Sequence, residues 1–217
     1  MKGLLLKDLY NLQGTLKIYL ALPVIVTFLS YTNQDMTLLQ LMVSFLGIFI
    51  MLSSFAYDEM CKFDSYALTL PLSRRDLVKS KFVLMNISTL YGIFMSLVLG
   101  FGMYLLFPGN FPTFDSGDYL LSTIAIGCAI LILNSIMAPF VFQYGTNKAR
   151  VIIVIIFMVI GVGGGVIFNS AFFTEFINME FLEKMLEQLP YLLAALCVVS
   201  EMISYIVSCN IVLKKEY

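Results

Sequence analysis

Six long apolar stretches restrict the fold of this chain more than any other feature of the sequence. They lie at about residues 16–31, 36–56, 82–107, 119–142, 151–168 and 190–213. Each approaches the roughly 20 apolar residues that a helix needs to cross a bilayer. Because lipid offers no hydrogen bonds to the backbone, stretches of this kind cross it as helices. The sequence therefore predicts an all-α membrane protein with six transmembrane helices in one domain, residues 1–217.

The composition excludes several classes of protein. Of the residues, 60% are hydrophobic and only 12% are charged, whereas soluble domains average about 25% charged residues. The chain has no histidine and its net charge is −1, so metal chemistry, hydrolysis and nucleic-acid binding are all disfavoured. The four cysteines have no zinc or disulfide spacing, and we interpret them as packing residues. No phosphate-binding G-x-x-x-x-G-K-[ST] motif occurs. We therefore expect a protein that is not itself an enzyme and that binds no metal or cofactor.

The basic residues predict the orientation in the membrane. When the six stretches are taken as spans, all thirteen lysines and arginines except Lys184 fall on one side. Basic residues accumulate on the cytoplasmic side of membrane proteins. Both termini and the polar segment 57–81 are therefore expected in the cytoplasm, and residues 169–189 outside.

The segment 57–81 is the longest polar interruption with mixed charge. Four of its apolar residues recur at helical spacing: Met60, Phe63, Ala67 and Leu70. This pattern predicts a short amphipathic helix that Pro71 ends. Ser73 with Asp76 three residues later predicts a capping box and the start of a new helix. Two helices that meet at a fixed bend could transmit a push from a soluble partner, while the alternative is an ordinary loop.

Two further segments have amphipathic character. Residues 1–15 place leucines at helical spacing among charged residues, which predicts a helix along the membrane surface. Residues 169–189 mix phenylalanines and leucines with four glutamates, which predicts short helices that dip into the outer interface. The alternative for the second segment is a capping helix with no direct role.

Two features inside the predicted spans bear on packing and transport. Gly161 and Gly165 form a G-x-x-x-G pair, which favours close helix packing within the chain or across a dimer; the alternative is a broken helix. Glu201 is the only formally charged residue near the middle of a span. Three roles remain open for Glu201: a hydrogen bond to a polar group such as Asn134 or Ser135, a place on the translocation path, or proton coupling.

Three stretches of the sequence carry a resemblance to a known family: LLLKDLY at the start, DEMCKFDSYALTLPLSRRDLVKSKF, and APFVFQYGTNKARVI. With them the chain resembles the ABC-2 type permeases, the membrane subunits of bacterial ABC exporters. The resemblance implies an ATP-binding subunit on a separate chain, which would hold ATP and Mg. It also implies that two permeases pair, as a homodimer or a heterodimer.

The resemblance gives each segment a role. Residues 1–15 would be the connecting helix, residues 57–81 would contain the coupling helix, and residues 169–189 would form extracellular re-entrant helices. The second cytoplasmic loop, residues 145–150, would lie beside the coupling helix. Docking on the ATP-binding subunit would fall to Asp58, Glu59, Lys62, Phe63, Asp64, Tyr66, Leu70 and Pro71. Arg74, Arg75 and Asp76 would steer the helix that follows.

These implications set the expected function. We expect a permease of the bacterial cell membrane that exports an amphipathic substrate, such as an antimicrobial or cytolytic peptide or a lipid-like compound, and so contributes to peptide export or antimicrobial resistance. The alternative is a secondary transporter or channel subunit that is driven by an ion gradient and uses Glu201. An intramembrane enzyme is disfavoured, because the spans lack histidine and paired carboxylates.

Overall fold

The computed structural model describes residues 2–67, 69, 73–111, 115–152, 154–155, 158 and 179–214. Regular structure in this part of the chain is helical. The helices are α1 (Lys2–Asn33), α2 (Met36–Met60), α3 (Phe63–Ala67), α4 (Arg74–Leu106), the 3₁₀ turn η1 (Pro108–Asn110), α5 (Ser116–Tyr144) and α8 (Met179–Lys214). Residues 146–152 are also helical. The prediction of an all-α fold is confirmed for the described residues.

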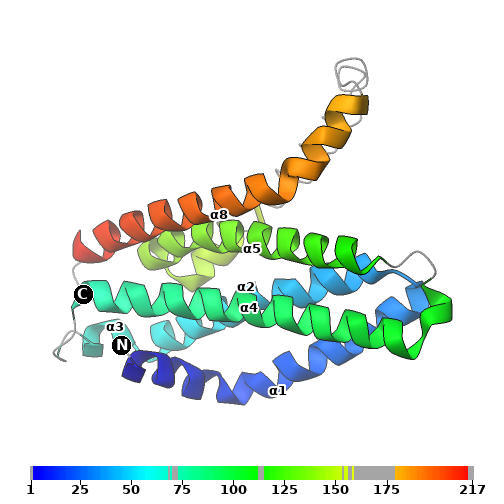
Figure 1. The fold of residues 1–217 in the computed structure, drawn as a ribbon. Helices are drawn as coiled ribbons and strands as arrows, with labels where there is room; N and C mark the ends of the chain where they lie inside the picture. The colour runs from blue at the N-terminus through cyan, green and yellow to red at the C-terminus, as the bar shows by residue number, and fades with distance from the viewer. Residues whose placement is uncertain are drawn as a thin grey trace.

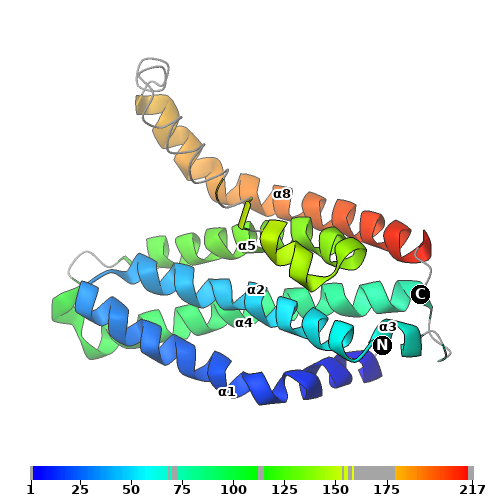
Figure 2. The ribbon, with the colours of Figure 1, turned by 180° about the vertical axis from the view of Figure 1, so that it is seen from behind.

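The long helices run side by side as an elongated bundle (Figure 1). In both views α5 and α8 lie on one side of α2 and α4, and α1 lies on the other side (Figures 1 and 2). The amino end of α1, the connection from α2 to α4 and the carboxyl end of α8 meet at one end of the bundle. We call this the α3 end, and the opposite end, which carries Pro108–Asn110, the η1 end.

Four described helices are long and apolar enough to cross a membrane: Met36–Met60, Arg74–Leu106, Ser116–Tyr144 and Leu192–Lys214. A fifth results if the two parts of α1, Gly3–Thr15 and Lys17–Asn33, which meet at 57°, form one span. The predicted span 151–168 lies largely outside the described residues. The count of six spans therefore stays a prediction, and the described residues contain four or five of them.

The bend in α1 separates its two predicted parts. The second part coincides with the predicted span 16–31, and the first part with the predicted surface helix 1–15. The face of the first part that other helices cover includes the charged residue Asp8, while Leu9 is exposed. Sequence spacing alone does not show which face of a short helix a neighbour covers.

Helix α8 starts earlier than the predicted span. Residues 179–189, expected as separate amphipathic helices, continue directly into the span through Pro190. A proline inside a helix removes one hydrogen bond and bends the helix, but it does not have to end it. The first turns of α8 project away from the other helices (Figure 1). Residues 169–178 lie outside the described residues.

The core consists of three apolar clusters along the bundle. The largest joins α2, α4, α5 and α8 and includes Met51, Met85, Ile130 and Val212. Since lipid is as apolar as these side chains, close packing rather than exclusion from water holds such helices together. Close packing is most evident between α2 and α4, where Gly47 and Gly92 bring the two backbones together. The glycines predicted to pack helices, Gly161 and Gly165, lie outside the described residues.

Candidate functional site

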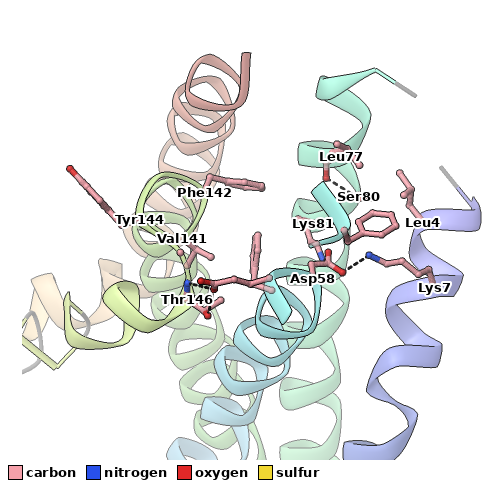
Figure 3. A pocket seen from close by; sticks show the side chains of 14 residues that line it. Leu4, Lys7, Asp58, Leu77, Ser80, Lys81, Val141, Phe142, Tyr144 and Thr146 are labelled. Atoms are coloured by element: carbon pink, nitrogen blue, oxygen red, sulfur yellow. Dashed lines mark hydrogen bonds and ion pairs between the residues drawn. The ribbon is translucent and has the colours of Figure 1, made fainter. Parts of the chain in front are cut away.

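A cavity of about 220 Å³ opens at the α3 end (Figure 3). It lies between α1, α2, α3, α4 and the carboxyl end of α5. Its walls combine aromatic side chains with charged and polar ones. The aromatic residues are Phe55, Phe63, Phe142 and Tyr144, and the charged or hydroxyl-bearing residues include Lys7, Asp58, Glu59, Ser80, Lys81 and Thr146.

Four charged side chains form a closed set of ion pairs beside this cavity. Lys7 Nζ lies 2.5 Å from Asp58 Oδ1 and 3.0 Å from Asp8 Oδ1. Lys81 Nζ lies 2.6 Å from Asp58 Oδ2 and 3.0 Å from Asp8 Oδ1. Each lysine thus contacts both aspartates, and positive and negative charges alternate around the set. We call Lys7, Asp8, Asp58 and Lys81 the ion-pair ring.

The ion-pair ring is shielded from solvent. Asp8, Asp58 and Lys81 are only 1%, 6% and 7% exposed. Lys81 also donates a hydrogen bond of 2.7 Å to Ser54 Oγ. The side chain of Lys7 is 23% exposed. Two positive and two negative charges balance, so the ring places no net charge in a poorly solvated region. Loss of one member would leave an uncompensated charge, which typically costs about 3–5 kcal/mol.

The ring also holds the short helix α3. Lys7 Nζ lies 3.5 Å from the centre of the Phe63 ring, a cation–π contact. Contacts of this kind contribute about 0.5–1 kcal/mol at exposed sites and more when they are desolvated. Figure 3 shows Lys7 of α1 reaching towards Asp58, with Lys81 of α4 beside this aspartate. Through Lys7, the position of α3 depends on the position of α1.

Helix α3 is shorter than the sequence predicted. Met60 is the last residue of α2, and Lys62 has a φ of 48°, in the left-handed region that an α-helix does not use. The helix expected from Met60 is therefore interrupted and starts again at Phe63. Leu70 and Pro71 lie outside the described residues, so the predicted end of the helix stays a prediction.

The predicted capping box at the start of α4 is confirmed. Asp76 N–H donates to Ser73 Oγ at 3.1 Å, and Ser73 N–H donates to Asp76 Oδ2 at 3.2 Å.

Arg74, the first residue of α4, contacts the carboxyl end of α8. Its Nη1 donates to the carbonyl oxygens of Val212 and Leu213 at 3.1 and 3.0 Å. A cation at these unpaired carbonyls fixes the carboxyl end of α8 to the start of α4.

Glu59 links the two connecting segments at the α3 end. Its Oε2 accepts a hydrogen bond of 2.8 Å from the backbone N–H of Thr146 and a second bond from the Thr146 hydroxyl. Thr146 begins the helical residues 146–152, so the carboxylate caps a helix amino terminus. Gly145 precedes it with a φ of 83°, and a Cβ there would lie 2.7 Å from Glu59 Oε1. Residues 145–150 therefore begin beside the carboxyl end of α2, and their contact with the coupling helix stays a prediction.

The structure brings together part of the predicted docking set. Asp58, Glu59 and Phe63 line the cavity, while Lys62, Tyr66 and Arg75 are exposed and do not line it. Asp64 belongs to α3, but its side chain lies outside the described residues, as do Leu70 and Pro71. Sequence reasoning missed Lys7, Asp8, Lys81 and Thr146. For the first three, the available signal was a balance of charge: Lys7 and Lys81 match Asp8 and Asp58 in number.

Glu201 has a different partner from the one predicted. Asn86 Nδ2 of α4 donates a hydrogen bond to Glu201 Oε1. Asn134 instead donates to Thr89 Oγ1 at 3.4 Å, and Ser204 donates to the carbonyl of Ser135. Residues three apart on a helix point only about 60° apart, so Glu201 reaches α4 while Ser204, on a neighbouring part of the same face, reaches α5. Glu201 thus has a hydrogen-bond partner, which is Asn86 and not Asn134 or Ser135, the two examples named from the sequence. Its place on the translocation path and its part in proton coupling stay predictions.

Long apolar helices with a charged cluster confined to one end define a multi-pass membrane protein. The model of a family described as ABC-2 family transporter protein matches residues 3–212. Because the match covers nearly the whole sequence, the chain belongs to this family of membrane transport components, which are not enzymes themselves. Comparison with curated proteins and with solved structures finds no match for the chain.

Proposed function

We propose that this chain is the permease subunit of an ATP-driven exporter of the bacterial cell membrane. The family generally works with an ATP-binding subunit. That subunit would bind ATP and Mg, while this chain would form part of the path along which the substrate crosses the membrane. The observation that carries the proposal is the surface at the α3 end. There, three of the predicted docking residues, Asp58, Glu59 and Phe63, line the cavity.

Exposed apolar side chains at this end favour a protein partner. Met60, Tyr66 and Tyr144 are 80%, 59% and 49% exposed, and they lie beside the charged residues of the α3 end, where lipid tails would be unfavourable. Aromatic and methionine side chains are enriched in protein interfaces. The docking partner proposed for this surface is the ATP-binding subunit.

The charge distribution supports a cytoplasmic α3 end. Exposed basic side chains gather there, on the α2–α4 connection, on the first turns of α4, on residues 146–152 and at the end of α8: Lys62, Arg75, Lys79, Lys148, Arg150 and Lys214. Under the positive-inside rule this end faces the cytoplasm. Both ends of the chain would then be cytoplasmic.

The substrate and the second permease belong to the same proposal. We propose an amphipathic substrate, such as an antimicrobial or cytolytic peptide or a lipid-like compound, that moves outward. A second permease, either a copy of this chain or a sister chain, would complete the path. Support for these points comes from the family resemblance, together with the adaptable apolar surface that 19 Phe and 13 Met provide.

Substitution of Tyr66 tests the docking surface. Tyr66→Asp should release the ATP-hydrolysing protein that co-purifies with the tagged permease, because exposed aromatic anchors often contribute about 2 kcal/mol or more to an interface. Tyr66→Phe keeps the ring and should retain the complex. Phe107→Asp, at an exposed aromatic residue of the η1 end, is the matched control. Unchanged co-purification and ATP hydrolysis with Tyr66→Asp would contradict docking at this surface.

A further inference from the structure

The ion-pair ring joins three helices that are far apart in the sequence. Lys7 and Asp58 are 51 residues apart, and Asp8 and Lys81 are 73 residues apart. Among the residues whose burial is described, the charged side chains that are buried are Asp8, Asp58 and Lys81. Buried charge in this part of the chain is therefore concentrated at one contact between α1, α2 and α4.

The segment that the ring holds would otherwise be weakly specified. Gly3–Thr15 bends away from the rest of α1 by 57°. Leu4, Asp8 and Leu12 form its buried face, at helical spacing, while Leu6 and Leu9 are exposed. Because leucines lie on two faces of this segment, they do not determine which face contacts the other helices. Either face could equally well contact lipid. A charged ring has one register, because a rotated segment would separate Asp8 from Lys81.

The ring also determines the position of Phe63. Lys7 contributes to two ion pairs and to the cation–π contact with Phe63. If Gly3–Thr15 moved, Lys7 would leave Phe63, and α3 would lose a contact that connects it to α1. This effect on α3 would come through Lys7, because Lys81 and Asp8 make no described hydrogen bond or ion pair with α3.

We propose that the ion-pair ring is a positioning cluster that seats Gly3–Thr15 on α2 and α4 and, through Lys7, orients α3 for its partner. Asp8, Asp58 and Lys81 act as positioning residues. The seating of Gly3–Thr15 is independent of the function proposed above, whereas the orientation of α3 for a partner rests on it. Alternating charge is the essential property, because each member has two neighbours of opposite sign.

Thiol reactivity of a buried position reports the seating directly. The experiment uses the full-length permease in membranes, with Cys61, Cys128, Cys197 and Cys209 replaced and Leu12→Cys introduced. Leu12 is 1% exposed on the seated face, so N-ethylmaleimide should modify the introduced thiol slowly. Asp58→Asn or Lys81→Met leaves a net charge in the ring and should raise the rate about tenfold or more, because the segment opens locally.

A charge-balanced double variant separates ion pairing from general damage. Asp58→Asn with Lys81→Met leaves the pair Lys7 and Asp8, so the double variant should react more slowly than either single variant. A thiol introduced by Met103→Cys, buried at the η1 end, should stay unreactive in every variant and so exclude global unfolding. Unchanged reactivity in both single variants, or a double variant at least as reactive as the singles, would overturn the proposal.

A second measurement separates the two parts of the proposal. The same variants are tested for the ATP-hydrolysing protein that co-purifies with the unsubstituted permease, and the single variants should lose most of it. If the single variants make the Leu12→Cys thiol reactive but still retain the ATP-hydrolysing protein, the proposed role of the ring in orienting α3 is overturned. The same result supports the seating of Gly3–Thr15. If no ATP-hydrolysing protein accompanies even the unsubstituted permease, the proposed function fails, and the thiol reactivity still decides the seating.

Discussion

At the scale of single residues, small side chains determine how closely α2 and α4 approach. A Cβ on Gly47 would lie 3.2 Å from Ser88 O and Thr89 Cα, and a Cβ on Gly92 would lie 3.1 Å from Ser44 Cα and O. The contact is reciprocal, because each glycine faces a small polar residue of the other helix. Small residues recur at every fourth position of α4: Ser88, Gly92, Ser96 and Gly100. This small-x-x-x-small repeat is the signal that predicts such a contact.

The Gly92→Ala variant should therefore be destabilised. The atoms that its Cβ would meet belong to the backbone of α2, so they cannot move aside as a flexible side chain would, and overpacking typically costs about 1–3 kcal/mol. Gly102→Ala is the matched control on the same helix, since no heavy atom lies within 4 Å of its Cβ position. Thermal unfolding in detergent should show a lower midpoint for Gly92→Ala and an equal or higher one for Gly102→Ala. Equal midpoints for both variants would contradict the close approach.

At the scale of elements, the helix ends at the α3 end are tied to one another. Glu59 of α2 caps the helical residues 146–152, and Arg74 of α4 binds the last carbonyls of α8. Helix ends carry unpaired backbone groups that need such partners. A displacement of the connection between α2 and α4 would therefore reach both α5 and α8 without passing through the apolar core.

Arg74→Ala should loosen the carboxyl end of α8. Hydrogen bonds from a charged donor contribute about 1.5–3 kcal/mol when shielded, and the partly exposed position reduces this to about 1 kcal/mol. Arg75→Ala removes the same charge from an exposed neighbour and is the control. Hydrogen exchange of the last two turns of α8 should be faster in Arg74→Ala alone. Equal exchange in the two variants would show that the contact with Val212 and Leu213 contributes nothing.

The elements differ in how far the sequence predicts them. The capping box of Ser73 and Asp76 depends on residues three positions apart, so local sequence was sufficient. The interruption at Lys62 was not predictable, because a lysine has no intrinsic preference for a left-handed φ. The ion-pair ring was missed as well, since a pairing between Asp8 and Lys81 across 73 residues depends on the packing of the helices. The same holds for Asn86 as the partner of Glu201.

At the scale of the whole molecule, the two ends differ in charge. The η1 end has a cavity of about 360 Å³ lined by Asp35, Asp115 and Asp118. Hydrogen bonds from the Thr37 hydroxyl, and then from the Thr37 backbone, lower the pKa of Asp35. The exposed basic residues of the α3 end fit a cytoplasmic α3 end and an outer η1 end, whereas acidic residues contribute little to orientation.

Cysteine labelling tests this orientation. In a background without the four native cysteines, Ser116→Cys at the η1 end should react with a membrane-impermeant reagent in intact cells, and Asn147→Cys at the α3 end should not. Both positions are exposed, so burial does not confound the comparison. Opening the cells should make both positions reactive. Labelling of Asn147→Cys in intact cells would reverse the proposed orientation.

Glu201 distinguishes ATP-driven export from ion-coupled transport. A carboxylate in mid-membrane costs at least about 2.5–3.5 kcal/mol on insertion scales, and the hydrogen bond from Asn86 offsets part of this by joining α8 to α4. If the residue serves that contact, Glu201→Gln should leave ATP-dependent transport largely intact, because Gln keeps the shape and an oxygen acceptor. Glu201→Leu should lower stability or assembly, because Asn86 then loses its acceptor.

Transport measurements in reconstituted vesicles complete this test. With ATP and the co-purifying ATPase present, export should need no proton gradient, and Asn86→Ala should resemble Glu201→Leu rather than Glu201→Gln. An ion-coupled mechanism requires a group that gains and loses a proton, which Gln cannot do. Loss of transport in Glu201→Gln with normal assembly and ATP hydrolysis, together with the same loss when the proton gradient is collapsed, would therefore favour the ion-coupled alternative over ATP-driven export.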